Sequence, residues 1–534
     1  MLVRICFLLI TLWASCDLQA WGGFKPQVTY AVGSNPVAAA LADFNHDTFK
    51  DIAVVNQGSN TISILLNNGD GTFTLAHTYS VPVGALPISI VAADFNGDNI
   101  PDLAVLNSGN LTVSIFIGNG DGSFQPPSTF SVGSAPTLLA SGDFTGDGRQ
   151  DLVVSYAGLS NTVELFIGNG DGTFTPDGFF SVGANPSCIA VADVNGDGNL
   201  DLAVTNASAS TVSVLLGDGH GNFLAQQTFA VGNAPASVAV GRLTSTDFPD
   251  LVVANSADST VSTLIGNGDG TFQSQATHAV GLTPVSVALA DITSSGNLDI
   301  VTANNVSNTV TVLTNSAAYN TQNTFTVGNA PSYIVLGDLN NDGLPDAVVT
   351  NSADNTISVL INTFQQTITF PPIPDKVYST PPFAISATSS SGLPVFFSIL
   401  SGPATISGNI ITITGTGTVV VAANQPGQNQ IGPAPQVTQS FVVEPNFIGQ
   451  VIHNRFLTQT DIIYRLSWVP SPDPNVTQFA LYKNGMLIQV TPASGPFKFE
   501  EHNKKKGVVE TFTLIALNAA GTALYVSTVT LGDR

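Results

Sequence analysis

The sequence predicts an all-β protein: a seven-bladed β-propeller whose last blade is completed by an N-terminal strand, followed by two β-sandwich domains. Three observations predict this fold. An aspartate-rich loop returns about every fifty residues, a Gly-x-x-Pro marker returns with it, and each unit holds four short apolar stretches separated by turn residues. The composition agrees, because 50 glycines and 31 prolines with only 10% charged residues are typical of a turn-rich β protein.

The repeat occurs seven times. The first position of the loop falls on Asp43, Asp94, Asp143, Asp193, Arg242, Asp291 and Asp338. The second marker falls on Gly33/Pro36, Gly84/Pro87, Gly133/Pro136, Gly183/Pro186, Gly232/Pro235, Gly281/Pro284 and Gly328/Pro331. Each unit is expected to form one four-stranded blade; in the fourth unit we expect strands at 189–192, 202–205, 211–216 and 223–231.

The two ends of the array predict how the ring closes. The seventh unit stops at Asn362 without its fourth strand, and residues 22–33 align with the missing piece. The N-terminal strand is therefore expected to complete the last blade, an arrangement that hides sheet edges from other chains.

The loop of the fourth unit shows the chemistry of the repeat. Positions 1, 3, 5 and 9 are Asp193, Asn195, Asp197 and Asp201, and the carbonyl of Asn199 at position 7 offers a further oxygen. Calcium prefers such an oxygen-only shell. Gly198 at position 6 permits the positive φ that a short loop needs to fold back around an ion.

These units resemble the FG-GAP/VCBS repeats of bacterial surface proteins and, more distantly, the integrin alpha propeller. The resemblance rests on Gly-x-x-Pro, Asp-x-Asn-x-Asp-Gly-x-x-Asp and Gly-Asn-Gly-Asp-Gly-Thr-Phe, and it covers about residues 22–364. It implies a seven-bladed propeller with calcium in the loops between the first and second strands of the blades. It implies no single activity, since the fold serves adhesins, lectins and accessory domains of enzymes.

When the ligand positions of the FG-GAP/VCBS pattern are carried over to this sequence, about five loops are expected to bind calcium, which would have a structural role. The expected ligands are Asp43, Asn45, Asp47, Asp51; Asp94, Asn96, Asp98, Asp102; Asp143, Thr145, Asp147, Asp151; Asp193, Asn195, Asp197, Asp201; and Asp338, Asn340, Asp342, Asp346. Whether the sixth loop binds metal stays open, because it keeps only two carboxylates: Asp291, Thr293, Ser295, Asp299. The fifth loop departs from the pattern, with Arg242 in the place of a cation: Arg242, Thr244, Thr246, Asp250.

The alternative for all these loops is a set of Asx-turns, in which Asp and Asn side chains bond only to their own backbone. In an up-and-down blade the turns between the third and fourth strands share a face with the loops. Their aspartates are interpreted as hairpin-turn residues: Asp70, Asp121, Asp171, Asp218 and Asp269. The opposite face, with neutral loops such as 56–60, is left for a ligand.

The net charge and the N-terminal residues indicate which partners and which location are expected. A net charge of −23 without a basic stripe argues against a nucleic-acid partner. Residues 1–20 are predicted to be a signal peptide, with Cys16 as a weak candidate for a lipid anchor, and no later stretch is long enough to span a membrane. We therefore expect a secreted or cell-surface protein.

Two further domains are predicted after the propeller domain, which spans 21–364. Residues 365–445 resemble a bacterial immunoglobulin-like module, and residues 446–534 resemble a fibronectin type III domain with Trp468 in its core. Lys504, Lys505 and Lys506 are interpreted as a solvated loop.

No constellation of catalytic residues stands out. The sequence has no Gly-x-Ser-x-Gly elbow, His-Glu-x-x-His pair or phosphate loop, and Glu164 is the only glutamate of residues 21–364. The function predicted is a non-catalytic, exported binding or adhesion module with an unknown protein or glycan ligand. The alternative is a carbohydrate-active enzyme, either a calcium-assisted polysaccharide lyase or a hydrolase, or a lectin that uses the propeller face.

Overall fold

The structure is a computed structural model of the chain. It describes residues 21–158, 160–244, 248–315, 319, 321–428, 431–444, 446–455, 460–468, 475–495 and 497–532. The predicted signal peptide, Cys16 and Thr246 lie outside these residues. Within them, no helix has the length and apolar character needed to cross a membrane. The chain divides into two compact units, one ending at Phe364 and one beginning at Gln365.

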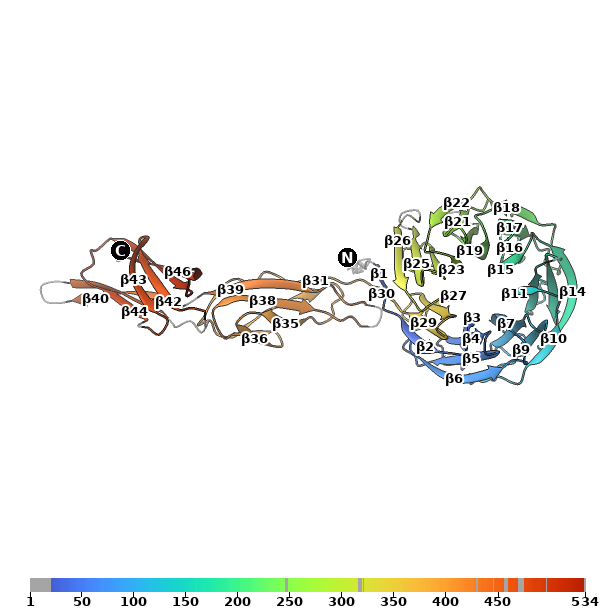
Figure 1. Cartoon of the computed structure of the whole chain (residues 1–534), viewed down its shortest axis with the longest axis horizontal. Coiled ribbons are helices and arrows are strands. Elements are labelled where there is room, and N and C mark those ends of the chain that lie inside the picture. Colours follow the sequence, from blue (N-terminus) through green and yellow to red (C-terminus); the bar gives the residue numbers. More distant parts are fainter. Residues whose placement is uncertain are drawn as a thin grey trace, which may run out of the picture. The chain divides into compact units, whose positions relative to one another are not determined.

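The first unit is a seven-bladed β-propeller, and each blade is a four-stranded antiparallel sheet (Figure 1). The strands, given blade by blade from the first to the fourth strand, are β3 (Pro36–Ala42), β4 (Asp51–Asn56), β5 (Thr61–Asn67), β6 (Phe73–Ser80); β7 (Pro87–Ala93), β8 (Asp102–Asn107), β9 (Thr112–Phe116), β10 (Ser128–Ser131); β11 (Pro136–Gly142), β12 (Asp151–Tyr156), β13 (Thr162–Gly168), β14 (Phe174–Ser181); β15 (Pro186–Ala192), β16 (Asp201–Asn206), β17 (Thr211–Leu215), β18 (Gln227–Ala230); β19 (Pro235–Gly241), β20 (Asp250–Asn255), β21 (Thr260–Leu264), β22 (Ala276–Ala279); β23 (Pro284–Ala290), β24 (Asp299–Asn304), β25 (Thr309–Thr314), β26 (Thr321–Thr326); and β27 (Pro331–Gly337), β28 (Asp346–Asn351), β29 (Thr356–Leu360), β2 (Val28–Ala31).

The second strand of every blade is buried along its whole length. Neighbouring blades cover both of its faces, which explains why these segments are nearly continuous apolar runs such as Leu251–Asn255 instead of alternating ones. The fourth strands are largely exposed. The first strands of adjacent blades contact each other around the whole ring, including β27 with β3.

The N-terminal strand closes the ring, as predicted. β2 pairs with β29 in the register Val28 to Val359 and supplies the missing fourth strand of blade seven. A second short strand, β1 (Trp21–Phe24), pairs with β30 (Asn362–Phe364) just after the last blade. The indole Nε1 of Trp21 donates to Asn362 Oδ1 at 2.8 Å. Both ends of the propeller are thereby tied together.

The glycine of the Gly-x-x-Pro marker has a packing role. In blade four, a Cβ on Gly183 would lie 2.5 Å from Cγ of Asn206, the last residue of β16. The Asn206 amide donates to Thr211 Oγ1 at 3.0 Å and to Ser213 Oγ at 2.8 Å. The marker is glycine here because its side-chain space is taken by a hydrogen-bonded asparagine.

Two details differ from the sequence-based expectation. The fourth strand of blade four begins at Gln227 instead of residue 223, because Phe223 makes only an isolated bridge with Gly217. Gly84 of blade two does not occupy the packing position of its counterparts, since it has a φ of 78° and no atom within 4 Å of a Cβ placed on it. Extra residues precede Pro87 in this blade, so the marker is displaced from the asparagine.

The second unit contains two modules, each with its own core. Their strands are β31 (Ile368–Thr369), β32 (Lys376–Val377), β33 (Phe383–Ala384), β34 (Thr388–Ser389), β35 (Phe396–Ser401), β36 (Ala404–Ser407), β37 (Ile410–Ile413), β38 (Gly417–Asn424), β39 (Val437–Glu444), and then β40 (Phe447–Arg455), β41 (Thr460–Trp468), β42 (Gln478–Lys483), β43 (Met486–Pro492), β44 (Lys498–Glu501), β45 (Val509–Leu517), β46 (Ala523–Gly532).

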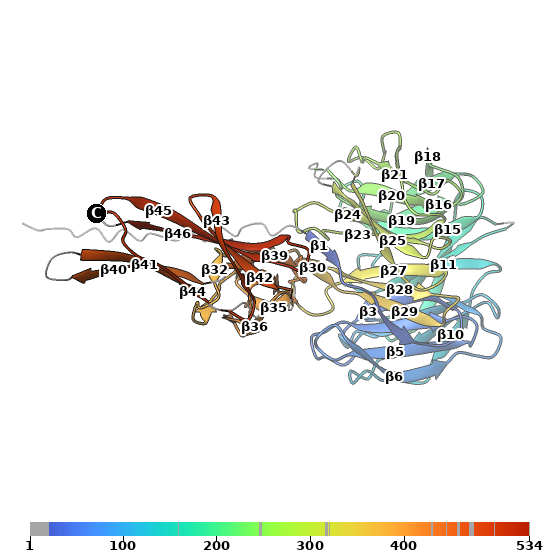
Figure 2. The ribbon, with the colours of Figure 1, turned by 60° about the vertical axis from the view of Figure 1, so that its left-hand side comes forward.

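In the last module, the sheet β40-β41-β44 packs on the sheet β43-β42-β45-β46 (Figure 2). Trp468 is 5% exposed and packs edge-on against Phe447, with the ring centroids 6.2 Å apart. The prediction that Trp468 is a core residue is confirmed.

The packing of the marker glycine can be tested with Gly232→Ala. The new Cβ would lie 2.5 Å from Cγ of Asn255, so the asparagine and its hydrogen bonds must shift. Overpacking of this kind is expected to lower the free energy of unfolding of the propeller by about 1–3 kcal/mol, measured by urea denaturation.

Gly178→Ala is the matched control, because its new Cβ would have no neighbour closer than 3.4 Å. An equal loss of stability in both variants would contradict the packing role of Gly232.

Candidate metal centre

The predicted loops connect the first and second strands of each blade. In blade four the loop lies between Ala192, at the end of β15, and Asp201, at the start of β16. Its two glycines have positive φ, 76° at Gly196 and 89° at Gly198. In blade one the same turn is made without glycine, because His46 and Thr48 adopt φ values of 57° and 78°.

The first aspartate organises the loop backbone. Asp193 Oδ1 accepts from the amides of Gly196 and Asp197 at 2.7 and 3.2 Å, and its Oδ2 accepts from the amide of Gly198 at 2.8 Å. Asn195 Oδ1 also accepts from the amide of Asp197, at 3.0 Å. The Asx-turn bonds predicted as the alternative are therefore present.

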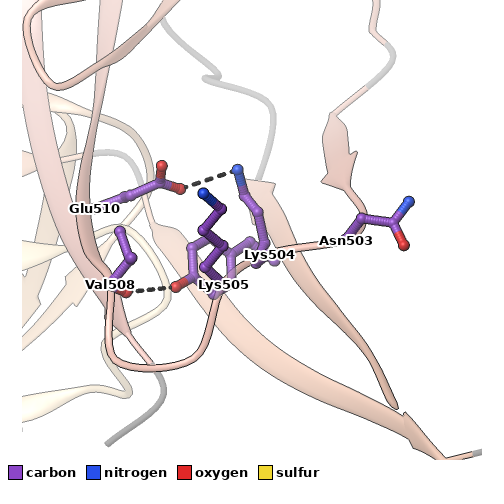
Figure 3. A pocket seen from close by; sticks show the side chains of 6 residues that line it. Asn503, Lys504, Lys505, Val508 and Glu510 are labelled. Carbon is purple, nitrogen blue, oxygen red and sulfur yellow. Dashed lines mark hydrogen bonds and ion pairs between the residues drawn. The ribbon is translucent and has the colours of Figure 1, made fainter. Parts of the chain in front are cut away.

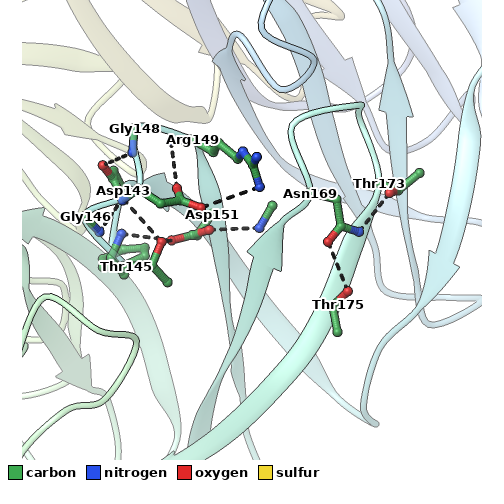
Figure 4. A network of polar contacts seen from close by, with 12 residues as sticks. Asp143, Thr145, Gly146, Gly148, Arg149, Asp151, Asn169, Thr173 and Thr175 are labelled. Atoms are coloured by element: carbon green, nitrogen blue, oxygen red, sulfur yellow. Dashed lines mark hydrogen bonds and ion pairs between the residues drawn. The ribbon is translucent and has the colours of Figure 1, made fainter.

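Blade three shows the same arrangement (Figure 4). Asp143 accepts from the amides of Gly146 and Gly148 at 2.7 and 2.9 Å. Asp147 accepts from the amide of Arg149 at 2.9 Å, and the Arg149 guanidinium lies 3.7 Å from the same carboxylate. Thr145, predicted as a ligand, points its hydroxyl at Asp143 and Asp151 at 3.5 and 3.4 Å.

The aspartate at position 9 acts as a clasp between two turns of its blade. In blade four, Asp201 Oδ2 accepts from the amide of Val194 in the loop, and its Oδ1 accepts from the amide of Gly217 in the turn between the third and fourth strands, both at 2.8 Å. The same two-point contact, with distances of 2.7–2.9 Å, is made by Asp51, Asp102, Asp151, Asp250, Asp299 and Asp346.

These position-9 carboxylates are buried without a counter-charge. Each of the seven is 0% exposed, and within the described ranges no lysine, arginine or histidine forms an ion pair with them. Burial, helped by repulsion from the loop aspartates, raises the pKa of Asp51, Asp102 and Asp201 to about 6. It raises the pKa of Asp346 to about 7. Two amide donors per carboxylate offset only part of the lost hydration.

The residue after the first aspartate connects neighbouring blades. The carbonyl of Phe144 accepts from the amide of Gly221 in blade four at 3.0 Å, while the amide of Phe144 is held by Asp151 of its own blade. Equivalent bonds reach the next blade from the carbonyls of Phe44 and Phe95. Asparagine side chains supply the donor at three other junctions, where Asn67, Asn315 and Asn362 bond to Leu339, Leu243 and Ile292.

The donor chemistry of the complete loops fits calcium, because each offers several carboxylates, an amide or hydroxyl oxygen and a backbone carbonyl. In the part of the chain that the structure describes, however, no three His, Cys, Asp or Glu side chains are grouped as a ready-made metal cluster. Their oxygens bond to backbone amides instead. Calcium binding therefore stays a prediction.

The two degenerate loops keep the clasp although blade five has lost its other acids and blade six has lost one of them. In blade five, Asp250 holds the amides of Leu243 and Gly266 although the first position is Arg242. In blade six, Asp291 still accepts from Ser295 and Gly296 at 2.8 Å. The position-9 aspartate therefore bonds the two turns of its blade together even where the set of metal ligands is incomplete.

The aspartates between the third and fourth strands are hairpin-turn residues, as predicted. Asp70 accepts from both the amide and the hydroxyl of Thr72, and the hydroxyl bond lowers the pKa of Asp70. Asp121, Asp171 and Asp269 make the corresponding contacts with their own turns.

The opposite face is not as neutral as the sequence suggested. Asp258 accepts from the amide and side chain of Asn233 at 2.6 and 2.9 Å, and Asp354 makes the same pair of bonds with Asn329. Both acids lie in loops between second and third strands. They fix these loops to the start of their own blade.

Two features were not predicted from the sequence: a cavity lined by the first strands of several blades, and a buried pair formed by Tyr156 and Glu164. First strands of several blades line a cavity of about 150 Å³, with Ser89, Cys188, Ser286 and Tyr333 in its wall. Burial raises the pKa of the Cys188 thiol.

In blade three, the hydroxyl of Tyr156 donates to Glu164. This bond gives a structural role to the only glutamate of residues 21–364.

The lysine loop of the last module is only partly solvated (Figure 3). Lys504 is 12% exposed and forms ion pairs with Glu501 at 2.7 Å and Glu510 at 3.2 Å. A surface pocket beside it is lined by Lys505, Val508 and Tyr464, whose hydroxyl donates to the Val508 carbonyl at 2.8 Å. The expectation of a wholly solvated loop was wrong for Lys504, because two glutamates of the module hold it.

The clasp can be tested where metal ligands are missing. Asp250→Ala would leave the buried amides of Leu243 and Gly266 without an acceptor. We expect the free energy of unfolding to fall by about 2–5 kcal/mol, equally with calcium and with a chelator. Asp269→Ala, at an exposed turn, is the control and should cost less than about 1 kcal/mol. Equal losses in the two variants would refute the clasp.

Comparisons with known proteins identify the repeat. A family model described as FG-GAP-like repeat matches residues 43–105, 95–154, 143–204, 193–253, 243–302 and 291–349, more than half of the chain. No curated protein sequence matches. Among solved structures, a functionally unknown protein from Desulfotomaculum acetoxidans is 15% identical, with a TM-score of 0.43 over 56% of this chain and 91% of its own. A periplasmic gluconolactonase of Pseudomonas aeruginosa is 19% identical, with a TM-score of 0.42 over 56% and 87%. The repeats matched over residues 43–349 place this chain in the FG-GAP-like repeat family.

Proposed function

We propose that the chain is an exported, calcium-binding propeller protein that acts as a non-catalytic binding or adhesion module outside the cell or at its surface. The observation that carries the proposal is the buried, uncompensated negative charge of the loops. Asp51, for example, is 0% exposed and lies in a loop with Asp43 and Asp47, without an ion-pair partner among the described residues. Export is supported by the signal-like residues 1–20.

In each complete loop the side chains at positions 1, 3, 5 and 9 and the carbonyl at position 7 would hold the ion. Calcium would supply the positive charge that the buried position-9 aspartate lacks. The role proposed for it is structural, since the loop is bonded both to the turn of its own blade and to the next blade. Bound metal would therefore stiffen the junctions of the ring.

The face opposite the loops is the proposed binding surface for a protein or glycan. All seven residues that precede the marker prolines have positive φ, including the β-branched Thr283 at 55°. Non-glycine residues rarely adopt this conformation, and such strain is concentrated at functional sites. Exposed apolar side chains stand on the same face at Val83, Leu86, Leu282 and Val306.

Calcium titration tests the metal proposal. With a dissociation constant near ~10⁻⁴ M, ~1 mM calcium would add about 1.4 kcal/mol per site to the free energy of unfolding. We expect a large rise in the unfolding temperature of the chelated protein, and calorimetry should count about five sites.

A double variant, Asp193→Asn with Asp197→Asn, should remove one site from the count. The matched double variant on the opposite face, Asp258→Asn with Asp354→Asn, should remove none. Absence of both calcium uptake and thermal shift would leave the loops as Asx-turns only.

The non-catalytic role can be tested separately. The full chain, incubated with polyuronides and calcium, is expected to release no unsaturated sugars, measured by absorbance of the 4,5-double bond. Binding to immobilised glycans and matrix proteins should persist after Asp121→Ala, which changes only a hairpin turn of the acidic face. Release of unsaturated sugars would overturn the non-catalytic role in favour of a lyase.

A further inference from the structure

Blade six carries an apolar pair on the face opposite the loops between first and second strands. Leu282, which follows the marker glycine of this blade, is 56% exposed. Val306, in the loop between the second and third strands, is 60% exposed. The amide of Val306 donates to the Leu282 carbonyl at 3.3 Å, and the amide of Leu282 donates to Ser307 Oγ at 3.1 Å. The two apolar residues therefore lie side by side in a bonded pair of loops.

The two adjacent blades are polar or small at the same positions. Blades five and seven contact blade six through their first strands. In place of the apolar pair they have an asparagine and an alanine: Asn233 and Ala257 in blade five, and Asn329 and Ala353 in blade seven. Each also has an aspartate, Asp258 or Asp354, where blade six has Ser307. An acid therefore stands on each side of the apolar pair.

Hydrogen bonds join the loops of the three blades into one continuous surface. Between blades five and six, the amide of Thr283 donates to Oγ of Ser259, the residue after the blade-five acid, at 3.4 Å. Between blades six and seven, the Asn308 side chain donates to Asn329 Oδ1 at 3.1 Å. The Asn329 side chain in turn donates to Asp354 Oδ1 at 2.9 Å. The apolar pair and the two flanking acids therefore have fixed places relative to one another.

The flanking acids are negatively charged and have no counter-charge among the described residues. Asp258 and Asp354 are exposed, and no described lysine, arginine or histidine forms an ion pair with either. Hydrogen bonds from the amides and side chains of Asn233 and Asn329 lower the pKa of these carboxylates, so both are ionised at neutral pH. A basic partner would meet little repulsion, because residues 21–364 include only four lysines and arginines.

We infer that this surface binds a protein segment in which an apolar side chain lies between basic side chains. The inference rests on the proposed binding role of this face and names its partner. The apolar side chain would cover Leu282 and Val306, and the area removed from water would stabilise the complex. Lysine or arginine side chains on either side would pair with Asp258 and Asp354. An apolar centre with a charged rim matches the layout of a protein–protein interface.

The charges select the class of partner. Carboxylates at the rim of an interface attract segments of opposite charge and disfavour those of like charge. Anionic glycans and anionic membranes would place negative groups against Asp258 and Asp354. A basic protein segment is therefore the occupant that fits this surface.

An array of synthetic peptides of about 12 residues, probed with the full chain, tests the inference. Each peptide has a leucine pair at its centre, flanked on both sides by lysine, serine or glutamate. The flanking residues stand roughly one to five positions away, because each extended residue spans about 3.3 Å. We expect lysine-flanked peptides to bind at least about tenfold more tightly than serine-flanked ones, and glutamate-flanked peptides to bind more weakly still. High salt should reduce the preference for lysine.

Variants of the full chain test whether the peptides bind at this surface. Leu282→Ser with Val306→Ser should weaken binding of the lysine-flanked peptides by about tenfold or more. Asp258→Asn with Asp354→Asn should weaken it by about tenfold as well, because the charge is lost while an acceptor oxygen stays at each position.

Two double variants away from this surface are the matched controls. Leu75→Ser with Leu224→Ser removes leucines that are 48% and 63% exposed just after the turns between third and fourth strands. Asp121→Asn with Asp171→Asn removes two charges from those turns. Both control variants should bind the peptides as the wild type does.

Three results would overturn the inference: no peptide binding, equal binding of lysine-, serine- and glutamate-flanked peptides, or equal losses in the control variants and the variants of this surface. Glycans or matrix proteins that bind the wild type and both variants of this surface equally would overturn it while leaving the proposed binding function in place. A chain that binds none of the peptides, glycans or matrix proteins would overturn both.

Discussion

The structure of the propeller depends on one contact repeated seven times: a buried aspartate that accepts a backbone amide with each of its two oxygens. One amide belongs to the loop after the first strand, and the other belongs to the turn after the third strand. Three strands of a blade are thereby fixed relative to one another by a single side chain. The contact concentrates negative charge inside the fold, because each carboxylate is fully buried and its pKa, where it is shifted, moves upward. This buried negative charge is the feature that the proposed calcium ions would offset.

The residues held by this clasp also form hydrogen bonds between neighbouring blades. In blades one, two, three, five and seven, the residue that follows the first loop position gives its amide to the clasp of its own blade and its carbonyl to the next blade. At three junctions the donor is the backbone amide of Gly122, Gly172 or Gly221, and at three others it is the side chain of Asn67, Asn315 or Asn362. The ring is therefore held at the loop face by polar bonds as well as by the apolar packing of its first strands. A change in one loop acts on two blades.

The architecture could be predicted from the sequence because the same pattern of strands and loops occurs seven times. The period, the loop spacing and the missing fourth strand in the last unit were sufficient to predict seven blades and their N-terminal closure. It did not reveal why Gly183 is glycine, because the cause is Asn206, which lies 23 positions later and packs into the space of a side chain. The dual bonds of Asp201, the Asp258–Asn233 contact and the pairing of Lys504 with Glu510 likewise join residues that only the folded chain brings together. Metal geometry could not be predicted from spacing alone, because the same oxygens can bond to backbone amides.

The clasp aspartate is the same in all seven blades, whereas the loops on the opposite face differ between blades. This difference indicates which face is suited to bind a partner. Blade five lacks the other loop acids but has Asp250 and both of its amide bonds, so the clasp forms without a complete set of metal ligands. The loops on the other face differ in length and chemistry from blade to blade: Val83 and Leu86 protrude in blade two, whereas Asp258 and Asp354 fasten asparagines in blades five and seven. This variation is carried by a face whose turns are strained in every blade. A recognition surface on this face, as proposed, would need such differences between blades and a rigid support beneath them, and the loop face, held by the seven clasps, would provide that support.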